Sequence, residues 1–182
     1  MRDRGIKFTK SISPSIYYIG FNMRDKVVGG SSKRAKLLRQ AISIAINYEE
    51  YISIFLNGRG VVAHSPLPND IVKTAYNKVT HNLVNGRAVR KDIKIAKILM
   101  DEAGYKNGID PITGRRLQLS FDAAGTGSPD DKARLAWMTK QFKKLNIQLN
   151  IRASGYNRFQ ERVRTGQTQM FNWGWMADYP DA

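Results

Sequence analysis

The feature that most constrains this chain is an alternation of strand and helix patterns over its last third. The patterns are a strand at 117–121, a helix at 128–145, a strand at 147–151, a helix at 156–163 and a strand at 170–175. The first helix begins at Ser128-Pro129, a capping serine followed by a proline at the first helical position. Such alternation predicts an α/β fold, a mostly parallel sheet with helices on both faces.

The first two thirds contain a further strand and three helices. Residues 15–23 are rich in β-branched and aromatic side chains and predict a buried strand, and a helix begins at Lys33. Asn47 marks the junction to a short second helix, which ends at Asn57-Gly58. Prolines make residues 61–69 an extended loop, and Asn85-Gly86 predicts a turn. Asp92 is expected to cap a helix that ends at Gly104, with one buried face. That face is expected to consist of Ile95, Ile98, Leu99 and Ala103.

The length of 182 residues and the even spread of apolar residues indicate one globular unit. We expect an irregular lead-in over residues 1–14 and a single α/β unit over 15–182. No run approaches the roughly 18 apolar residues that span a bilayer, and the N-terminal residues lack the apolar centre of an export signal. The absence of Cys excludes disulfide scaffolds, thiol catalysis and Cys-ligated zinc.

The net charge of +15 predicts a positive field that attracts nucleic acid, anionic lipid or acidic ligands. The cations are spread over every predicted helix, whereas nucleic-acid modules usually concentrate them on one element. A solvated basic exterior is therefore the favoured interpretation, and nucleic acid is not a favoured partner. A basic nucleic-acid-binding module remains the alternative function.

The sequence contains no convergent catalytic motif. Gly125-Thr126-Gly127 precedes a helix as in a dinucleotide-binding turn, but Asp130 occupies the third glycine position. His64 and His81 have no second ligand one helical turn away, and we interpret them as surface residues. We therefore expect no enzymatic activity, no cofactor and no metal.

Residues 171–181 carry a different kind of signal. They place two tryptophans and two acids at the carboxyl end of the last strand. Ligands of parallel α/β sheets bind at that edge. Trp173 and Trp175 on one face could form a pocket wall, and Asp178 could pair with a cation. The alternative is that the tryptophans belong to the core and Asp178 opens a turn before Pro180. The residues alone favour neither.

Three segments resemble, in order and spacing, the peptide-binding class of bacterial ABC-transporter solute-binding proteins. They are 37–60, 92–121 and 144–182, and the resemblance covers the chain from Tyr17 onward. The most specific strings are Arg39-Gln40-Ala41 leading into Ala45-Ile46-Asn47, Glu102-Ala103-Gly104-Tyr105, and Trp175-Met176-Ala177-Asp178-Tyr179-Pro180-Asp181.

The resemblance implies the second lobe of a two-lobed periplasmic-binding-protein fold that closes on an oligopeptide or similar solute. The first lobe would be missing from this chain, together with an export signal for a periplasmic or extracytoplasmic location. The partners implied are the ligand and an ABC permease in the membrane. Asp178 matches the aspartate that holds the ligand's α-amino group, and Trp173, Trp175 and Met176 would line the pocket. Asn172 occupies a position where a cation could hold a ligand carboxylate.

Overall fold

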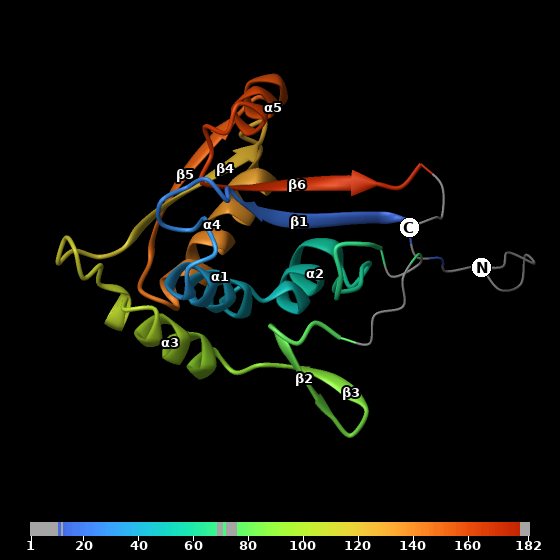
Figure 1. Cartoon of the computed structure of the whole chain (residues 1–182). Helices are drawn as coiled ribbons and strands as arrows, with labels where there is room; N and C mark the ends of the chain where they lie inside the picture. Colours follow the sequence, from blue (N-terminus) through green and yellow to red (C-terminus); the bar gives the residue numbers. More distant parts are fainter. Residues whose placement is uncertain (1–10, 12, 69–70, 72–75, 179–182) are drawn as a thin grey trace, which may run out of the picture.

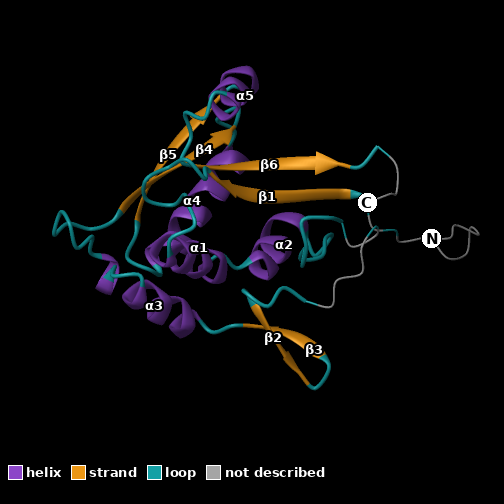
Figure 2. Ribbon diagram, viewed as in Figure 1, coloured by secondary structure: helices purple, strands orange, loops and turns teal. Residues whose placement is uncertain are grey.

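The computed structural model describes residues 11, 13–68, 71 and 76–178. Figures 1 and 2 show the arrangement of the strands and helices, which alternate one by one from residue 118 onward. The elements are β1 (Ser15–Phe21), α1 (Lys33–Ala45), α2 (Tyr48–Leu56), β2 (His81–Val84), β3 (Arg87–Arg90), α3 (Ile93–Glu102), the 3₁₀ turn η2 (Lys106–Gly108), β4 (Gln118–Ala124), α4 (Pro129–Lys143), β5 (Gln148–Ser154), α5 (Tyr156–Arg164) and β6 (Met170–Met176).

The main sheet has four strands in the order β1-β6-β4-β5. β4 runs parallel to both β5 and β6, and β1 is antiparallel to β6. β6 pairs with β4 only at Phe121↔Met170 and Asp122↔Phe171, whereas its whole length pairs with β1. The sheet is thus mostly parallel, as predicted, and the β1–β6 pair extends beyond it as a two-stranded ribbon (Figure 1).

The two crossover helices α4 and α5 cover opposite faces of the sheet (Figure 1). The step from β4 to β5 runs one way along the sheet, and the step from β5 to β6 runs back past β4. Because both crossovers follow the usual right-handed rule, their helices fall on opposite sides. α1 packs on the α4 side, which gives that face two helical elements. The predicted arrangement of helices on both faces is therefore present.

The core lies between the sheet, α1 and α4, and α3 joins it through its contact with α1. Ser32, Asn47 and Ser128 cap their helices through side-chain oxygens that accept backbone N–H groups. The apolar residues that recur at helical spacing in α1 are all buried: Ala35, Leu38, Ala41, Ile42 and Ala45. The largest fully buried apolar side chains are Phe121, Phe142, Leu38, Ile42, Leu119, Met170 and Val28.

Two predicted faces differ in the structure. The first strand is not buried, because β1 lies at the edge of the sheet and leaves Tyr17 80% and Tyr18 41% exposed. On the predicted face of α3, Ala103 is buried and Leu99 packs half-buried against the core, as expected. Ile95 and Ile98 are exposed instead of buried, and Ala96 and Met100 take their place in the core. The small Ala96 allows α3 to lie close against α1, and this contact decided the rotation of the helix.

The predicted turn at Asn85-Gly86 joins β2 and β3 into a hairpin, which the sequence had not indicated. Both turn residues have positive φ, 49° and 76°, the conformation that suits a tight hairpin turn. The hairpin extends away from the main sheet, beside the start of α3 (Figure 1).

Candidate functional site

The carboxyl end of β6 forms the candidate ligand site. Trp173 and Trp175 lie on one face of the ribbon, opposite Tyr18 and Ile16 respectively on β1. The intervening Gly174 faces Tyr17 on the other side, where an added Cβ would come within 2.8 Å of the Tyr17 ring. This glycine thus allows the tyrosine ring to lie across the strand.

Trp173 belongs to an aromatic cluster that joins β6 to α5. Its ring centroid lies 5.2 Å from Phe159, 6.3 Å from Tyr156 and 6.5 Å from Phe171. Trp175 has no ring partner among the described residues and is 42% exposed. The two tryptophans therefore differ in their surroundings. Trp173 is half-buried against α5, as a core residue would be, whereas Trp175 has its ring at the surface, where it can contact a ligand.

The other three predicted site residues are exposed. Asn172 and Met176 alternate with the tryptophans and point from the opposite face of β6. Asp178 lies just beyond the strand, after Ala177, whose N–H donates to Pro14 O at 2.9 Å. This bond fixes the backbone of the residue that precedes Asp178. The predicted residues Tyr179, Pro180 and Asp181 lie outside the described residues.

A charged cluster at Asp122, on the same sheet, is not among the sites that the sequence predicts. Asp122 is 1% exposed and contacts two arginines. Arg152 donates to its Oδ2 at 2.8 Å and to Gln167 O at 3.1 Å, and Arg162 pairs with its Oδ1. Asp122 and Arg152 are register partners on parallel strands. The available signal was one acid and one arginine at matching positions of two predicted strands.

A second polar cluster fastens the hairpin to the junction of α1 and α2. His81 Nε2 lies 2.8 Å from Glu49 Oε1, and Arg90 donates to Glu49 Oε2 at 3.0 Å and to Ile44 O at 2.5 Å. His81 is 3% exposed, so its interpretation as a surface residue was wrong. Its burial is possible because both ring nitrogens have partners, Glu49 and the Thr80 hydroxyl.

Glu49 and the neighbouring His64, whose ring centroid lies 4.8 Å from that of His81, have lowered pKa values. Burial, together with the nearby His81, holds the pKa of His64 below its usual 6.5. Burial of Glu49 by itself favours the protonated acid. The hydrogen bond with His81, a backbone hydrogen bond and the charge of Arg90 together outweigh it and hold the pKa of Glu49 below 4.5.

We expect acid to destabilise the fold in two steps. The unfolded chain protonates His64 more readily than the folded chain does, so stability falls as the pH drops below 6.5 toward the lowered pKa. The contribution of Glu49 is present above 4.5 and is lost as the pH falls through its lowered pKa. Thermal unfolding followed by circular dichroism across this range measures both steps. The variant His64→Gln should lose the first step only, and an unchanged first step would contradict its assignment.

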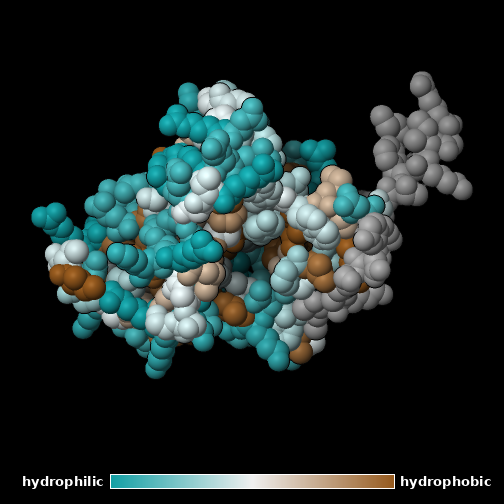
Figure 3. Space-filling model, turned by 45° about the horizontal axis from the view of Figure 1, so that its top comes forward, coloured by the Kyte–Doolittle hydropathy of each residue, from teal (hydrophilic) through white to brown (hydrophobic). Residues whose placement is uncertain are grey.

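Most of the drawn face of the molecule is hydrophilic (Figure 3), as a solvated basic exterior predicts. Several arginines nevertheless have partners within the fold: Arg39 donates to Val28 O at 2.6 Å, and Arg90, Arg152 and Arg162 have the partners given above.

Within the described ranges, no three His, Asp or Glu side chains gather as a metal site would require. No described helix is both long enough and apolar enough to cross a membrane.

Comparison with known proteins places these features in a family. Residues 2–182 match the family of bacterial extracellular solute-binding proteins, family 5 Middle. A curated relative, heme-binding protein A of Haemophilus influenzae, is 26% identical over 167 residues, which are 92% of this chain and 27% of that protein.

Solved structures show the same fold. The ABC transporter-associated periplasmic binding protein DppA from Helicobacter pylori, in complex with the peptide STSA, matches with a TM-score of 0.72 and 24% identity. The match covers 93% of this chain and 28% of that one. The oligopeptide-binding protein AppA from Bacillus subtilis, in complex with a nonapeptide, matches with a TM-score of 0.67 and 22% identity over 91% of this chain and 32% of that one. The chain therefore spans about a third or less of these relatives.

Proposed function

Because the chain belongs to the bacterial extracellular solute-binding proteins of family 5, we propose that it is one lobe of an ABC importer's binding protein. In this proposal the lobe closes with a first lobe on an oligopeptide or similar solute, which is then delivered to a membrane permease. The observation that carries the proposal is the family match over residues 2–182, with its carboxyl-terminal Trp-x-x-Asp string on an exposed strand end.

Asp178 is the proposed anchor for the ligand's α-amino group. Its carboxylate is exposed and follows a strand end that is held by the Ala177–Pro14 hydrogen bond. A carboxylate and an ammonium group form a charge-assisted hydrogen bond, which strengthens when a second lobe excludes water from the contact. The position therefore suits an electrostatic anchor that acts when the lobes close.

Trp175 and Met176 are proposed to supply apolar contact for the ligand from the two faces of the strand end, because both are large, apolar and exposed just before Asp178. Trp173, on the same face of β6 as Trp175, is proposed to form a part of the pocket wall that the aromatic cluster on α5 holds in place. Asn172, on the Met176 side of the strand, offers an amide that can hydrogen-bond a ligand backbone but carries no charge for a ligand carboxylate.

The domain division follows from the same proposal. Residues 15–182 form the lobe, and residues 1–14 are the lead-in from the first lobe. The chain's share of its relatives, 27% to 32%, agrees with one lobe of a larger protein. The proposed location is periplasmic or extracytoplasmic, with the export signal in a preceding part of the protein. Transport binding requires no bond to be made or broken, so no enzymatic activity and no cofactor are proposed.

The proposal predicts saturable binding of short peptides by the complete two-lobed protein, measured by calorimetric titration at physiological salt. Peptides with acetylated amino termini should bind much more weakly. Asp178→Asn should lower the affinity for free peptides by about tenfold or more, which corresponds to 1.4 kcal/mol or more. Asp130→Asn, an exposed acid on α4, is the matched control and should bind normally.

Two results would argue against the amine anchor: equal affinity for free and acetylated peptides, or an Asp178→Asn variant that binds as the parent does. A chain that instead binds DNA or RNA with steep salt dependence would favour the nucleic-acid module, since the net charge of +15 supports that alternative.

A further inference from the structure

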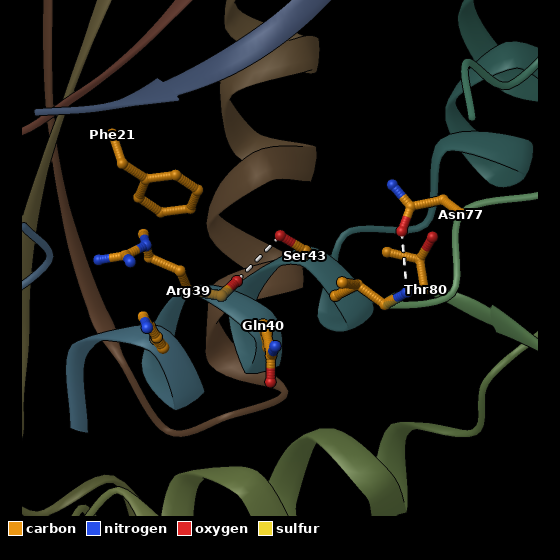
Figure 4. A pocket seen from close by; sticks show the side chains of 8 residues that line it. Phe21, Arg39, Gln40, Ser43, Asn77 and Thr80 are labelled. Atoms are coloured by element: carbon orange, nitrogen blue, oxygen red, sulfur yellow. Dashed lines mark hydrogen bonds between the residues drawn. The ribbon is translucent and has the colours of Figure 1, made fainter. Parts of the chain in front are cut away.

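A cavity lies between α1, the end of β1 and residues 76–80, away from Asp178 (Figure 4). Its volume is about 270 Å³, near the lower end of ordinary ligand pockets. It is lined by Phe21, Lys36, Arg39, Gln40, Ser43, Asn77, Val79 and Thr80. Three segments that are distant in the sequence thus form one small pocket.

The lining of this cavity is rich in hydrogen-bond donors. Lys36 and Arg39 supply positive charge from α1, and no Asp or Glu is among the lining residues. The side-chain oxygen of Asn77 already accepts the Val79 N–H at 2.9 Å, which leaves its NH₂ group as a donor. Figure 4 shows that nitrogen turned toward the side of the cavity where Ser43 and Phe21 lie.

The remaining lining groups set the shape and polarity of a ligand. The Ser43 hydroxyl donates to Arg39 O at 2.9 Å, so its oxygen can only accept a further bond. Phe21 and Val79 provide apolar surface on two sides. The pocket therefore matches a molecule with an anionic head and a short apolar part, and Ser43 and Gln40 supply oxygens that can accept from a donor on it.

We propose that this cavity binds a small organic anion through a carboxylate or phosphate group held by Lys36 and Arg39. Arg39 is preorganised for this role, because its Nη1 is fixed on Val28 O at 2.6 Å and holds the guanidinium in place. The opposite wall is fixed as well: the Asn77 N–H donates to His64 Nδ1 at 3.3 Å, and Thr80 bonds to the buried His81 at 2.8 Å.

This site is separate from the proposed amine anchor. Phe21 pairs with Met170 at one end of the β1–β6 ribbon, and Ser15 pairs with Met176 at the other end. Six strand residues at about 3.3 Å each place the two ends roughly 20 Å apart. Anion binding here can therefore succeed or fail independently of the Asp178 proposal.

The test is an NMR titration of the isotope-labelled 182-residue chain with inorganic phosphate and, separately, with propionate, at constant ionic strength. We expect saturable shifts of the Asn77, Val79 and Thr80 amides and of the Gln40 side-chain amide. The probe that saturates at the lower concentration identifies the preferred head group, and saturation by either one supports the site.

Lys36→Gln should weaken binding about fivefold, the effect of one charge about 4 Å away in a water-like dielectric. Lys33→Gln is the matched control, an exposed lysine one turn earlier on α1 that does not line the cavity. Both lysines are exposed, so both variants should fold. Chemical shifts that never saturate with either probe would rule out the site. An equal loss of affinity in the two variants would also rule it out, because the net charge alone would then attract the anions.

Discussion

Asp122→Ala should destabilise the fold by about 3–5 kcal/mol, since it removes the shared acid of a buried ion cluster. The carboxylate is 1% exposed and lies between Arg152 and Arg162. Without it, the half-buried Arg162 charge loses its partner and stays in a position that water reaches poorly. Urea unfolding of the variant and the parent measures the loss as a lower midpoint with an unchanged slope.

The two arginines should contribute unequally. Arg152 is 45% exposed in its side chain and Arg162 only 16%. Arg152→Gln should therefore cost under about 1 kcal/mol, as solvent-screened pairs do, and Arg162→Gln should cost more. Asp101→Ala, an exposed acid near the end of α3, is the matched control and should unfold as the parent does. A loss for Asp122→Ala no larger than for Asp101→Ala would show that the cluster adds no stability.

Leu119→Ala should cost about 2–5 kcal/mol, because it leaves a cavity in the middle of the core. Leu119 is 1% exposed on β4, which has paired strands on both sides and helices above and below. The surrounding core has little freedom to collapse into the space, so we expect a value in the upper part of this range. The same urea unfolding experiment measures it.

Leu83→Ala is the matched control for this loss. Leu83 is also a strand leucine, but it lies 52% exposed on the hairpin. Its truncation should change stability by no more than about 0.5 kcal/mol. Similar losses for the two leucines would mean that the hairpin packs against something in solution, and they would contradict the exposure seen here.

The sequence was most informative where local signals and burial agree. The segment from 117 to 176 forms the predicted order of strands and helices, and Ser128 and Pro129 begin α4 as expected. Capping groups, turn glycines and alternating apolar residues act over a few positions, so neighbouring residues are enough to determine them. The family resemblance, too, rested on short strings and is confirmed by the match over residues 2–182.

The sequence was misleading where a contact with a distant segment decided the outcome. Ile95 and Ile98 have the spacing of a buried face, but the approach of α3 to α1 turned Ala96 and Met100 inward instead. His81 carries no local sign of burial, and only the arrival of Glu49 beside it satisfies its ring. β1 resembles a buried strand, but its place at the edge of the sheet exposes Tyr17.

The candidate sites divide in the same way. The sequence alone determined that the two tryptophans share one face of a strand and that Asp178 follows this strand. Residues two positions apart on a strand point to the same side. Only the tertiary structure decided that Trp173 packs on α5, that Asp122 meets two arginines, and that Lys36 faces residues 77–80 across a cavity. Each of these depends on how separate elements pack, and the free energy of that packing is shared among contacts that no short stretch of sequence contains.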